Sequence, residues 1–394
     1  MPDPIVVLGA ARTPIGGFLG ELKDASAPAL GAAAIRAALA RAGLDGAAID
    51  ETLMGCVLAA GLGQAPARQA ALAAGLPVGV GATTVNKMCG SGMKAAMLAH
   101  DLIAADSADI VVAGGMESMS NAPYLLERAR GGYRMGHGRV IDAMFLDGLE
   151  DAYDKGRLMG TFAEDCAQAY QFTREAQDAF ALRSLERAQG AMQAGAFAAE
   201  IAPVTIWAGK SETIVASDEQ PPKARPDKIP TLKPAFRDGG TVTAANSSSI
   251  SDGAAALVLT RESEATRRGI APIARIVGHA TYAAAPKDFP TAPIGAIRRL
   301  FDKTGWSAGA VDLYEINEAF AVVAMAAMRD LDLPADKVNV NGGACALGHP
   351  IGASGARILV TLIAGLKARG FRRGVAALCI GGGEGTAMAV ELAA

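Results

Sequence analysis

The chain has 394 residues, enough for two or three compact units that bury their own cores. Hydrophobic residues make up 51% and charged residues 20%, a composition that excludes a disordered, collagen-like or coiled-coil protein. Its 37 basic and 40 acidic residues give a net charge of −3 with no long run of one sign, so nucleic acid is not expected as a partner.

The N-terminus leads directly into a predicted strand. The segment Met1-Pro-Asp-Pro4 precedes the run Ile5–Leu8, and it contains neither a basic n-region nor an Arg-rich presequence. The longest apolar stretches, Ala319–Met328 and Ile358–Leu366, are far shorter than the roughly 20 residues that a bilayer crossing needs. We therefore expect a cytoplasmic protein with no membrane partner.

A candidate nucleophile follows in the first part of the chain. Cys89 begins the turn Cys-Gly-Ser-Gly92, where an extended run gives way to the predicted helix Met93–Ala104. Unpaired N–H groups at a helix N-terminus favour an anion, so we expect the thiol pKa to lie below its ordinary value of about 8.5. A lone Cys is more commonly a small buried side chain, but this glycine-rich turn favours a nucleophile.

Residues 121–245 form a predicted insertion, because they have no counterpart later in the chain. Residues 161–195 are expected to be helical, with Thr173 as an N-cap. Residues 203–240 are rich in Pro, Lys, Asp and Gly, which predicts a meandering surface flap. Residues 246–270 then complete the first half, which begins with residues 1–120.

The last part of the chain repeats the first. Blocks around Ser26, Gly92 and Gly114 recur at offsets of 262 to 267 residues, around Thr291, Gly355 and Gly381 respectively. Within each copy, β-branched runs alternate with Ala/Leu-rich helices, which is typical of βαβ units on a largely parallel sheet. We expect an α/β fold of two similar halves, 1–120 and 271–394, with the functional site where they meet.

Two candidates for acid/base chemistry lie in the second half. His349 precedes Pro350 in a glycine-rich loop, which fixes an extended backbone and leaves the ring free to act as a base for Cys89. Cys379 closes a predicted strand, and the repeat places it at the same seam, although a strand-end Cys is more commonly a core residue. Gly381 and the next two glycines offer backbone N–H groups of the kind an oxyanion hole requires.

Asn317 allows two interpretations. It follows the predicted strand Val311–Ile316 and precedes a predicted helix, so it is as well explained as an N-cap as by a functional role. Cys56, Cys166 and Met116 are assigned to packing, whereas Met144 and Met159 could face a ligand.

The five cysteines are an odd set with no Cys-x-x-Cys pair, which argues against a disulfide framework and against a zinc knuckle. Cys345 stands four residues before His349, so a Cys3His zinc set with Cys89 and Cys379 is an alternative. The missing knuckle disfavours it, and we predict no metal site.

These motifs resemble the thiolase family over essentially the full chain. Cys89 in its turn resembles the acyl-accepting nucleophile, Gly348-His-Pro350 the catalytic histidine, and Cys379 in Cys-Ile-Gly-Gly-Gly383 the acid/base cysteine. Asn317-Glu-Ala-Phe320 resembles the segment whose Asn holds a water in an oxyanion hole. The resemblance implies two βαβ-type halves packed as a layered αβαβα core, with the loop domain 121–245 covering a coenzyme A site.

The resemblance also implies contacts to coenzyme A. Ser248 would hydrogen-bond the pantetheine arm, and the tunnel would be lined by Met159, Phe236, Ala244 and Phe320. Two positions depart from the family pattern: Leu158 stands where many short-chain thiolases have His, and Ser249 replaces a commoner Gly. The adenine end is expected at the flap, where Lys223 and Arg225 are candidates.

The implied reaction is a ping-pong acyl transfer between coenzyme A thioesters, with no permanently bound cofactor. Cys89, deprotonated by His349, would take the acyl group, and Cys379 would remove a methyl proton from acetyl-CoA. The enolate would be stabilised by His349 and a water on Asn317, and the tetrahedral intermediate by the backbone N–H groups of Cys89 and Gly381. The products of condensation would be acetoacetyl-CoA and coenzyme A.

Substrate length and assembly are less constrained. The resemblance is closest to acetoacetyl-CoA thiolases, and the stretch Met144–Leu149 with Met159 suggests a small acyl pocket; 3-ketoacyl-CoA and 3-oxoadipyl-CoA substrates are alternatives. A β-ketoacyl synthase would lack the second Cys at 379, and a non-catalytic acyl carrier would lack one of the three catalytic residues. We expect a homodimer or homotetramer, with the sheet edge near residues 83–88 as a contact.

Overall fold

The computed structural model describes residues 3–208 and 211–393. The first half-sheet contains β1 (Ile5–Arg12), β3 (Glu51–Gly55), β4 (Gly81–Val85), β5 (Ile110–Ser118) and β10 (Ser251–Arg261), in the spatial order β1-β10-β5-β3-β4, and β2 (Gly16–Gly17) pairs with β10. Its helices are α1 (Ala27–Ala42), α2 (Pro66–Ala73) and α3 (Ser91–Ala104). Helix α1 begins where the Ser26 hydroxyl accepts the Ala29 N–H and ends at Gly43, whose φ is 65°.

The second half-sheet repeats this arrangement. It contains β11 (Ala274–Ala283), β12 (Leu313–Ile316), β13 (Arg373–Ile380) and β14 (Glu384–Leu392), in the order β11-β14-β13-β12. Its helices are α8 (Ala292–Thr304), α9 (Ala321–Asp330), α10 (Ala344–Leu347) and α11 (Ser354–Arg369), whereas α7 (Glu262–Arg267) packs on β10 and β1 of the first half. The strand orders of the two half-sheets correspond. The second half-sheet has β11 at the place of β1, β14 at that of β10, β13 at that of β5 and β12 at that of β3. The predicted internal repeat is therefore confirmed.

The prediction of a largely parallel sheet is wrong. Only β3 with β4, β3 with β5 and β12 with β13 are parallel neighbours, and the remaining pairings are antiparallel. Parallel neighbours need a crossover of about a dozen residues or more. Only the three glycines Gly381–Gly383 separate β13 from β14, and Gly382 and Gly383 have φ values of 93° and 89°, so this connection can only reverse the chain.

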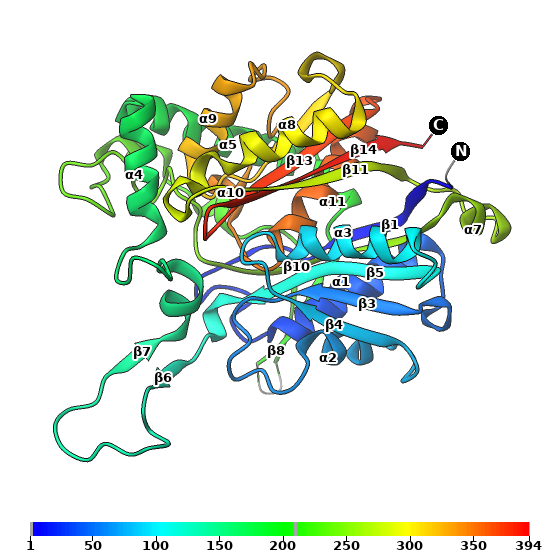
Figure 1. Ribbon diagram of the computed structural model, residues 1–394, viewed down its shortest axis with the longest axis horizontal. Helices are drawn as coiled ribbons and strands as arrows, with labels where there is room; N and C mark the ends of the chain where they lie inside the picture. Colours follow the sequence, from blue (N-terminus) through cyan, green and yellow to red (C-terminus); the bar gives the residue numbers. More distant parts are fainter. Residues whose placement is uncertain (1–2, 209–210, 394) are drawn as a thin grey trace.

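The layers are those of the predicted αβαβα core. Helices α3 and α11 contact each other and both half-sheets, whereas α1 and α2 cover the outer face of the first half-sheet and α8 covers that of the second (Figure 1). Pairing of Val6 with Arg275 and of Val7 with Ala274 joins the two half-sheets edge to edge. The seam between the halves is thus occupied by the two central helices.

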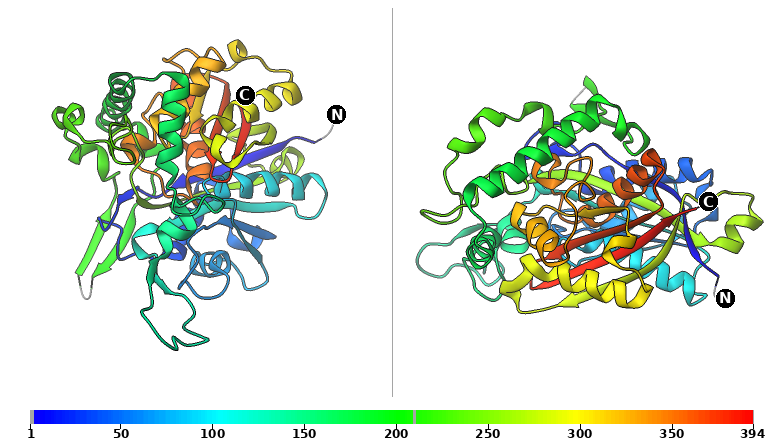
Figure 2. Two further views of the ribbon diagram at one scale, coloured as in Figure 1. Left: turned by 60° about the vertical axis from the view of Figure 1, so that its left-hand side comes forward. Right: turned by 90° about the horizontal axis from the view of Figure 1, so that it is seen from above.

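The segment 121–245 is more ordered than a loop domain. It contains the hairpin β6 (Tyr124–Leu126) and β7 (Val140–Asp142), which extends away from the body, a π-helix (Phe145–Leu149), α4 (Met159–Tyr170), α5 (Arg174–Gln193), the hairpin β8 (Val204–Ala208) and β9 (Ser211–Val215), and α6 (Gln220–Lys223) (Figures 1 and 2). Short 3-10 turns lie at Gly46–Ala48, Met119–Asn121, Ala196–Ala199, Pro226–Thr231, Pro286–Thr291 and Ala308–Ala310.

Two local expectations for this segment can be compared with the structure. The helical prediction for 161–195 is confirmed, and the Thr173 hydroxyl caps α5 by accepting the Ala176 N–H. The flap prediction for 203–240 fails at its start, because β8 and β9 place Val204, Ile206 and Val215 in the core of the first half. In the described ranges, no helix combines the length and apolar character needed to span a bilayer.

Candidate active site

Cys89 lies on a constrained turn at the start of α3. The residue before it, Met88, has a φ of 48°, which is a strained conformation for a side chain larger than glycine. The Ser91 hydroxyl accepts the Lys87 N–H at 2.8 Å and donates to the Met88 carbonyl at 2.6 Å. At Gly90 a Cβ would lie 2.4 Å from the Cδ1 atom of Ile380, so a larger residue there would displace that side chain. The direction of the Cys89 side chain is therefore fixed before any ligand binds.

Two backbone donors face the Cys89 sulfur. They are the N–H groups of Gly381 and of Cys89 itself, and both favour a thiolate. Burial nevertheless outweighs them and raises the pKa of Cys89 to about 11. The expected depressed pKa is therefore wrong, because a helix N-terminus cannot offset the loss of hydration around a buried sulfur. The resting residue is a thiol, with two N–H groups already directed at the place where negative charge would develop.

His349 is held in one orientation and is neutral. Its Nδ1 atom lies 2.5 Å from the Ser354 hydroxyl, and that hydroxyl donates to the Pro350 carbonyl. Since the Ser354 hydroxyl donates its hydrogen bond to Pro350, its oxygen is left to accept from a protonated Nδ1, and this tautomer leaves a lone pair on Nε2. Burial, with a smaller effect from the Arg357 cation, lowers the pKa of His349 to about 3. Nε2 is buried and has no hydrogen-bond partner in the described part of the chain.

Asn317 does not cap a helix. The N-cap of α9 is Phe320, so that interpretation of Asn317 is wrong. Instead, both polar atoms of the buried Asn317 amide lack a hydrogen-bond partner among residues 3–208 and 211–393. Leaving a buried polar group unpaired costs about 1–3 kcal/mol, so such groups in folded proteins call for an explanation. A ligand or a held water would satisfy this amide.

Cys379 lies at the buried end of β13 beside these groups. Burial raises the pKa of its thiol well above the ordinary value, and the nearby Cys89 sulfur raises it further. The Asn317 N–H donates to the carbonyl of Ala377, two residues before Cys379, at 2.9 Å. The structure therefore brings Cys89, Gly381, Asn317 and Cys379 together at the seam of the two halves.

The predicted coenzyme A residues come from the start of α4, the N-cap of α9 and the segment that precedes β10. The Phe236 and Phe320 rings meet edge to face with centroids 5.9 Å apart, and Phe236 covers Gly160, where a Cβ would lie 2.3 Å from the ring. The Met159 sulfur would lie 3.5 Å from a Cβ on Gly381. Met159 thus lies beside Gly381, whose N–H faces the Cys89 sulfur, and the Phe236 and Phe320 rings pack next to the start of α4.

Two further predicted residues come from the segment that precedes β10. The Ser248 N–H and hydroxyl both donate to the Ala319 carbonyl at 3.0 Å, which places Ser248 beside the Asn317 segment. Ala244 is exposed in the loop that leads to Ser248. Of the adenine-end candidates, Lys223 is paired with Glu21 and Glu219, and Arg225 with Asp227.

Glu117 is a residue of this region that sequence reasoning missed. It is fully buried, and its carboxylate accepts the N–H groups of Val57 at 3.1 Å, Leu58 at 3.0 Å and Gly352 at 2.8 Å, together with the Cys56 thiol. Burial raises its pKa to about 7. Gly352 lies three residues after His349, so Glu117 ties the His349 loop to β5 and to the loop after β3. The signal was present, since Glu117 ends the repeated block at Gly114.

The Cys3His zinc alternative is not supported by the geometry. No three of Cys89, Cys345, Cys379 and His349 come within ligand distance of one another in the described ranges. Cys345 instead donates its thiol proton to the Glu318 carbonyl. Its spacing to His349 therefore reflects the loop and not a metal pair.

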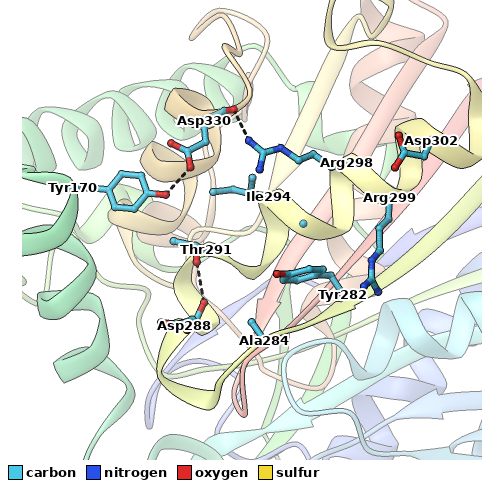
Figure 3. A pocket seen from close by; sticks show the side chains of 11 residues that line it. Tyr170, Tyr282, Ala284, Asp288, Thr291, Ile294, Arg298, Arg299, Asp302 and Asp330 are labelled. Carbon is cyan, nitrogen blue, oxygen red and sulfur yellow. Dashed lines mark hydrogen bonds between the residues drawn. The ribbon is translucent and has the colours of Figure 1, made fainter.

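A surface pocket lies elsewhere, between α4, α8 and α9 (Figure 3). Tyr170 donates to the Asp330 carboxylate at 2.7 Å, and Arg298 donates to the Asp330 carbonyl at 3.1 Å. None of the predicted site residues lines this pocket. Its polar groups bind one another, so we do not assign the site to it.

Comparison with known proteins agrees with the motifs. Residues 5–263 match the thiolase N-terminal domain and residues 270–392 the thiolase C-terminal domain. The chain is 52% identical to acetyl-CoA acetyltransferase 2 of Arabidopsis thaliana, covering 99% of this chain and 98% of that protein, and 48% identical to acetyl-CoA acetyltransferase of Pseudomonas aeruginosa, covering 98% of each.

Two solved structures are similar throughout. The acetyl-CoA acetyltransferase of Bacillus anthracis has a TM-score of 0.97 and 42% identity, covering 99% of both chains. The Acat5 thiolase of Ascaris suum in complex with coenzyme A has a TM-score of 0.94 and 41% identity, covering 99% of this chain and 100% of that one. This chain belongs to the thiolase family.

Proposed function

We propose that the protein is an acetyl-CoA C-acetyltransferase, which reversibly condenses two molecules of acetyl-CoA to acetoacetyl-CoA and coenzyme A without a permanently bound cofactor. The full-length relatives named acetyl-CoA acetyltransferase support this activity. The observation that carries it in this chain is the convergence of two backbone N–H groups on the Cys89 sulfur beside a second thiol, Cys379.

The first half-reaction forms the acyl-enzyme. The Cys89 sulfur attacks the thioester carbonyl while its proton passes to Nε2 of His349, since the resting pair is a thiol and a neutral imidazole. The new oxyanion accepts the N–H groups of Cys89 and Gly381, each typically worth about 3 kcal/mol. The C–S bond to coenzyme A breaks, and the departing sulfur takes the proton of Cys379, which leaves a Cys379 thiolate.

The second half-reaction forms the carbon–carbon bond. The Cys379 thiolate removes a methyl proton from a second acetyl-CoA, and the enolate oxygen accepts the Nε2–H of protonated His349 and a water held by Asn317. The enolate carbon attacks the acyl-enzyme carbonyl, the Cys89 sulfur leaves, and it recovers its proton from His349. Both thiols and the imidazole return to their starting states.

The surroundings of Cys89 favour a short acyl group. Cys89 packs in one cluster with Val57, Leu58, Met144 and Ile351, which restricts the space beside its sulfur. Longer 3-ketoacyl-CoA and 3-oxoadipyl-CoA substrates are the alternatives. Rates measured across acyl lengths test this assignment: a sharp fall beyond four carbons is expected, and a flat profile would contradict it.

We assign coenzyme A to the apolar path of Met159, Phe236 and Phe320, with Ser248 on the pantetheine arm and the segment 121–245 as its cover. The replacement of His by Leu158 in this chain removes one polar contact, so the arm depends more on Ser248. Ser248→Ala should raise KM for acetyl-CoA several-fold and leave kcat within about twofold.

We also propose that the protein is a homodimer or homotetramer. The hairpin of β6 and β7 exposes Tyr124, Leu126 and Val140, and β4 is the last strand of its half-sheet, with an unpaired edge. Exposed apolar side chains on a projecting hairpin and a free strand edge are both typical of subunit contacts. Light scattering of the wild type and of Leu126→Asp measures the assembly, and a monomeric wild type would contradict the proposal.

The acyl-enzyme is tested by mass spectrometry after mixing with acetoacetyl-CoA. Wild type should gain one acetyl group, and Cys89→Ala should gain none. A retained adduct in Cys89→Ala would remove Cys89 from the mechanism.

Cys379→Ser separates the two half-reactions. With acetyl-CoA it should still be acetylated on Cys89, because the coenzyme A thiolate can leave and take its proton from water. It should fail to exchange the methyl protons of acetyl-CoA in D2O, because a serine hydroxyl is not deprotonated near neutral pH and cannot act as the base. Full exchange in this variant would contradict the role of Cys379.

A further inference from the structure

Two of the four histidines of the chain meet on one carboxylate, far along the chain from each other. The His100 Nδ1 atom lies 3.1 Å and the His279 Nε2 atom 2.9 Å from the same oxygen, Oδ1 of Asp101. The two imidazole rings meet edge to face, with centroids 4.9 Å apart. The three ligand atoms all lie within 4.8 Å of one another.

The fold directs these side chains at each other. His100 and Asp101 lie near the end of α3, in the first half, and His279 lies on β11, in the second. A bulge between Ile276 and Gly278 shifts the register of β11 by one residue. Before the bulge, Ala274 and Ile276 face the central helices; after it, Ala280 packs on the outer side, so the odd-numbered His279 turns toward α3.

The site is partly open to solvent, and a metal ion would replace the two hydrogen bonds that join the imidazoles to Asp101. The side chains of His279, His100 and Asp101 are 14%, 23% and 52% exposed. Burial lowers the pKa of His279, which favours the neutral ring that binds metals, and the two imidazoles lower the pKa of Asp101. Lys303 opposes positive charge at this site, because its ammonium donates to the His279 carbonyl at 3.1 Å.

We propose that His100, Asp101 and His279 form a site for a divalent transition metal ion of the Zn²⁺, Co²⁺ or Ni²⁺ class. Metal–ligand bonds of about 2.0–2.1 Å place the ligand atoms of a tetrahedral site about 3.3 Å apart. The two N–O separations of 3.1 and 2.9 Å require only a small expansion to admit the ion. Two nitrogen ligands and one carboxylate suit these metals better than Mg²⁺ or Ca²⁺, and water fills the remaining position.

The proposed ion would join the two halves of the protein at a place remote from the thiols. An ion that binds the folded state and not the unfolded one stabilises it by mass action. The ion would therefore stabilise the contact between α3 and β11, and it would take no part in acyl transfer.

Titration of the tag-free, intact protein with Co²⁺ and Ni²⁺ tests the proposal. Wild type should bind one Co²⁺ per chain with the intense visible absorption of a tetrahedral centre, and its Tm should rise with metal concentration. His100→Ala and His279→Ala should each weaken binding at least about tenfold, as expected when one of three ligands is lost. His137→Ala, which alters an exposed histidine of the β6–β7 hairpin, is the matched control and should bind as wild type.

Two further results discriminate. Lys303→Met removes the opposing cation and should tighten Co²⁺ binding by about threefold. Equal binding by wild type and the double variant His100→Ala/His279→Ala would overturn the proposal, and so would a Co²⁺ spectrum dominated by thiolate charge transfer, which would place the ion on the cysteines. Acetyl transfer should be unchanged in the double variant without metal.

Discussion

Gly92 and Gly355 meet at the seam of the two halves, where α3 and α11 begin. A Cβ on Gly355 would lie 2.4 Å from the Met93 nitrogen, and one on Gly92 would lie 2.8 Å from the Ala356 nitrogen. The two glycines occupy equivalent positions of the internal repeat. Their contact lets both helix N-termini approach closely, and this approach positions Cys89 and His349 on the same seam.

Gly355→Ala should therefore lower both stability and activity. The added methyl group would meet backbone and not a flexible side chain, so α3 and α11 must separate. Overpacking of this kind costs about 1–3 kcal/mol, and kcat should fall at least about tenfold because misplacement by about 1 Å is that costly. Urea unfolding and steady-state acetyl transfer measure the two effects.

Gly365→Ala is the matched control for that variant. It lies in the same helix, but its Cβ would find no atom nearer than 3.7 Å. Alanine in a helix interior is favoured over glycine by about 1 kcal/mol, so this variant should be slightly more stable and fully active. Equal losses in both variants would show that the approach of the two helices is not what matters.

Glu117→Gln should weaken the support of the His349 loop. All four partners of the carboxylate are donors. The NH2 group of the glutamine would therefore face either the N–H groups of Val57 and Gly352 or the Leu58 N–H and the Cys56 thiol. We expect a loss of about 2–3 kcal/mol in unfolding free energy. We also expect kcat to fall at least about tenfold with KM for acetyl-CoA nearly unchanged, because Glu117 positions the loop without facing the coenzyme A path.

The repeat-equivalent residue provides a control for Glu117. Glu384 is partly exposed and paired with Lys87 at 2.5 Å. Glu384→Gln should change unfolding free energy by less than about 1 kcal/mol, as is usual for exposed ion pairs. A similar loss of stability in both variants would contradict the distinction drawn here.

The pH dependence of Cys89 alkylation checks its resting state. Because burial raises the pKa of Cys89 to about 11, the thiolate fraction should increase with pH through the whole accessible range. Inactivation by iodoacetamide should accelerate about tenfold per pH unit between pH 7 and 9, with no plateau near the ordinary thiol value of about 8.5. Protection by acetoacetyl-CoA shows that the reacting thiol lies in the site, and loss of the reaction in Cys89→Ala identifies it as Cys89.

His349→Ala distinguishes this state from an ion pair. The imidazole is neutral, with its pKa lowered to about 3, so its removal should leave the alkylation profile unchanged. A profile in the wild type that is flat between pH 6 and 8, and that becomes steep in His349→Ala, would indicate a thiolate–imidazolium pair instead.

The sequence predicted much of the architecture because repetition and motifs are local signals. The repeated blocks anticipated the matching strand orders, and the turns at Cys89, His349 and Cys379 anticipated the seam. Strand direction was not predictable in this way, because the repeat does not show whether β10 and β14 run parallel or antiparallel to the strands beside them. The pKa of Cys89 was predicted with the wrong sign because a helix terminus is visible in sequence and burial is not.

Side-chain convergence over long sequence distances was the least predictable feature. The repeated block that ends at Glu117 marked the residue, but the repeat does not indicate that its carboxylate accepts the N–H of Gly352, 235 positions later. His279 reaches Asp101 only because a bulge turns β11 over. Such contacts depend on tertiary register, which a one-residue change can reverse.

Asn317→Leu should raise stability while lowering activity. Both polar atoms of the Asn317 amide are buried without a partner in the described part of the chain, so replacing the amide by a side chain of similar size removes a cost of about 1–3 kcal/mol. The same change abolishes the group that would hold the enolate-stabilising water, so condensation should slow by about 10²-fold or more while acetylation of Cys89 persists.

Asn339→Leu is the matched control: its amide binds the Ile316 N–H and carbonyl at 2.8 Å and its φ is 49°, so this variant should lose stability. Urea unfolding measures the free energy of unfolding of both variants. A less stable Asn317→Leu protein would mean that the Asn317 amide stabilises the fold and would contradict its assignment to the reaction.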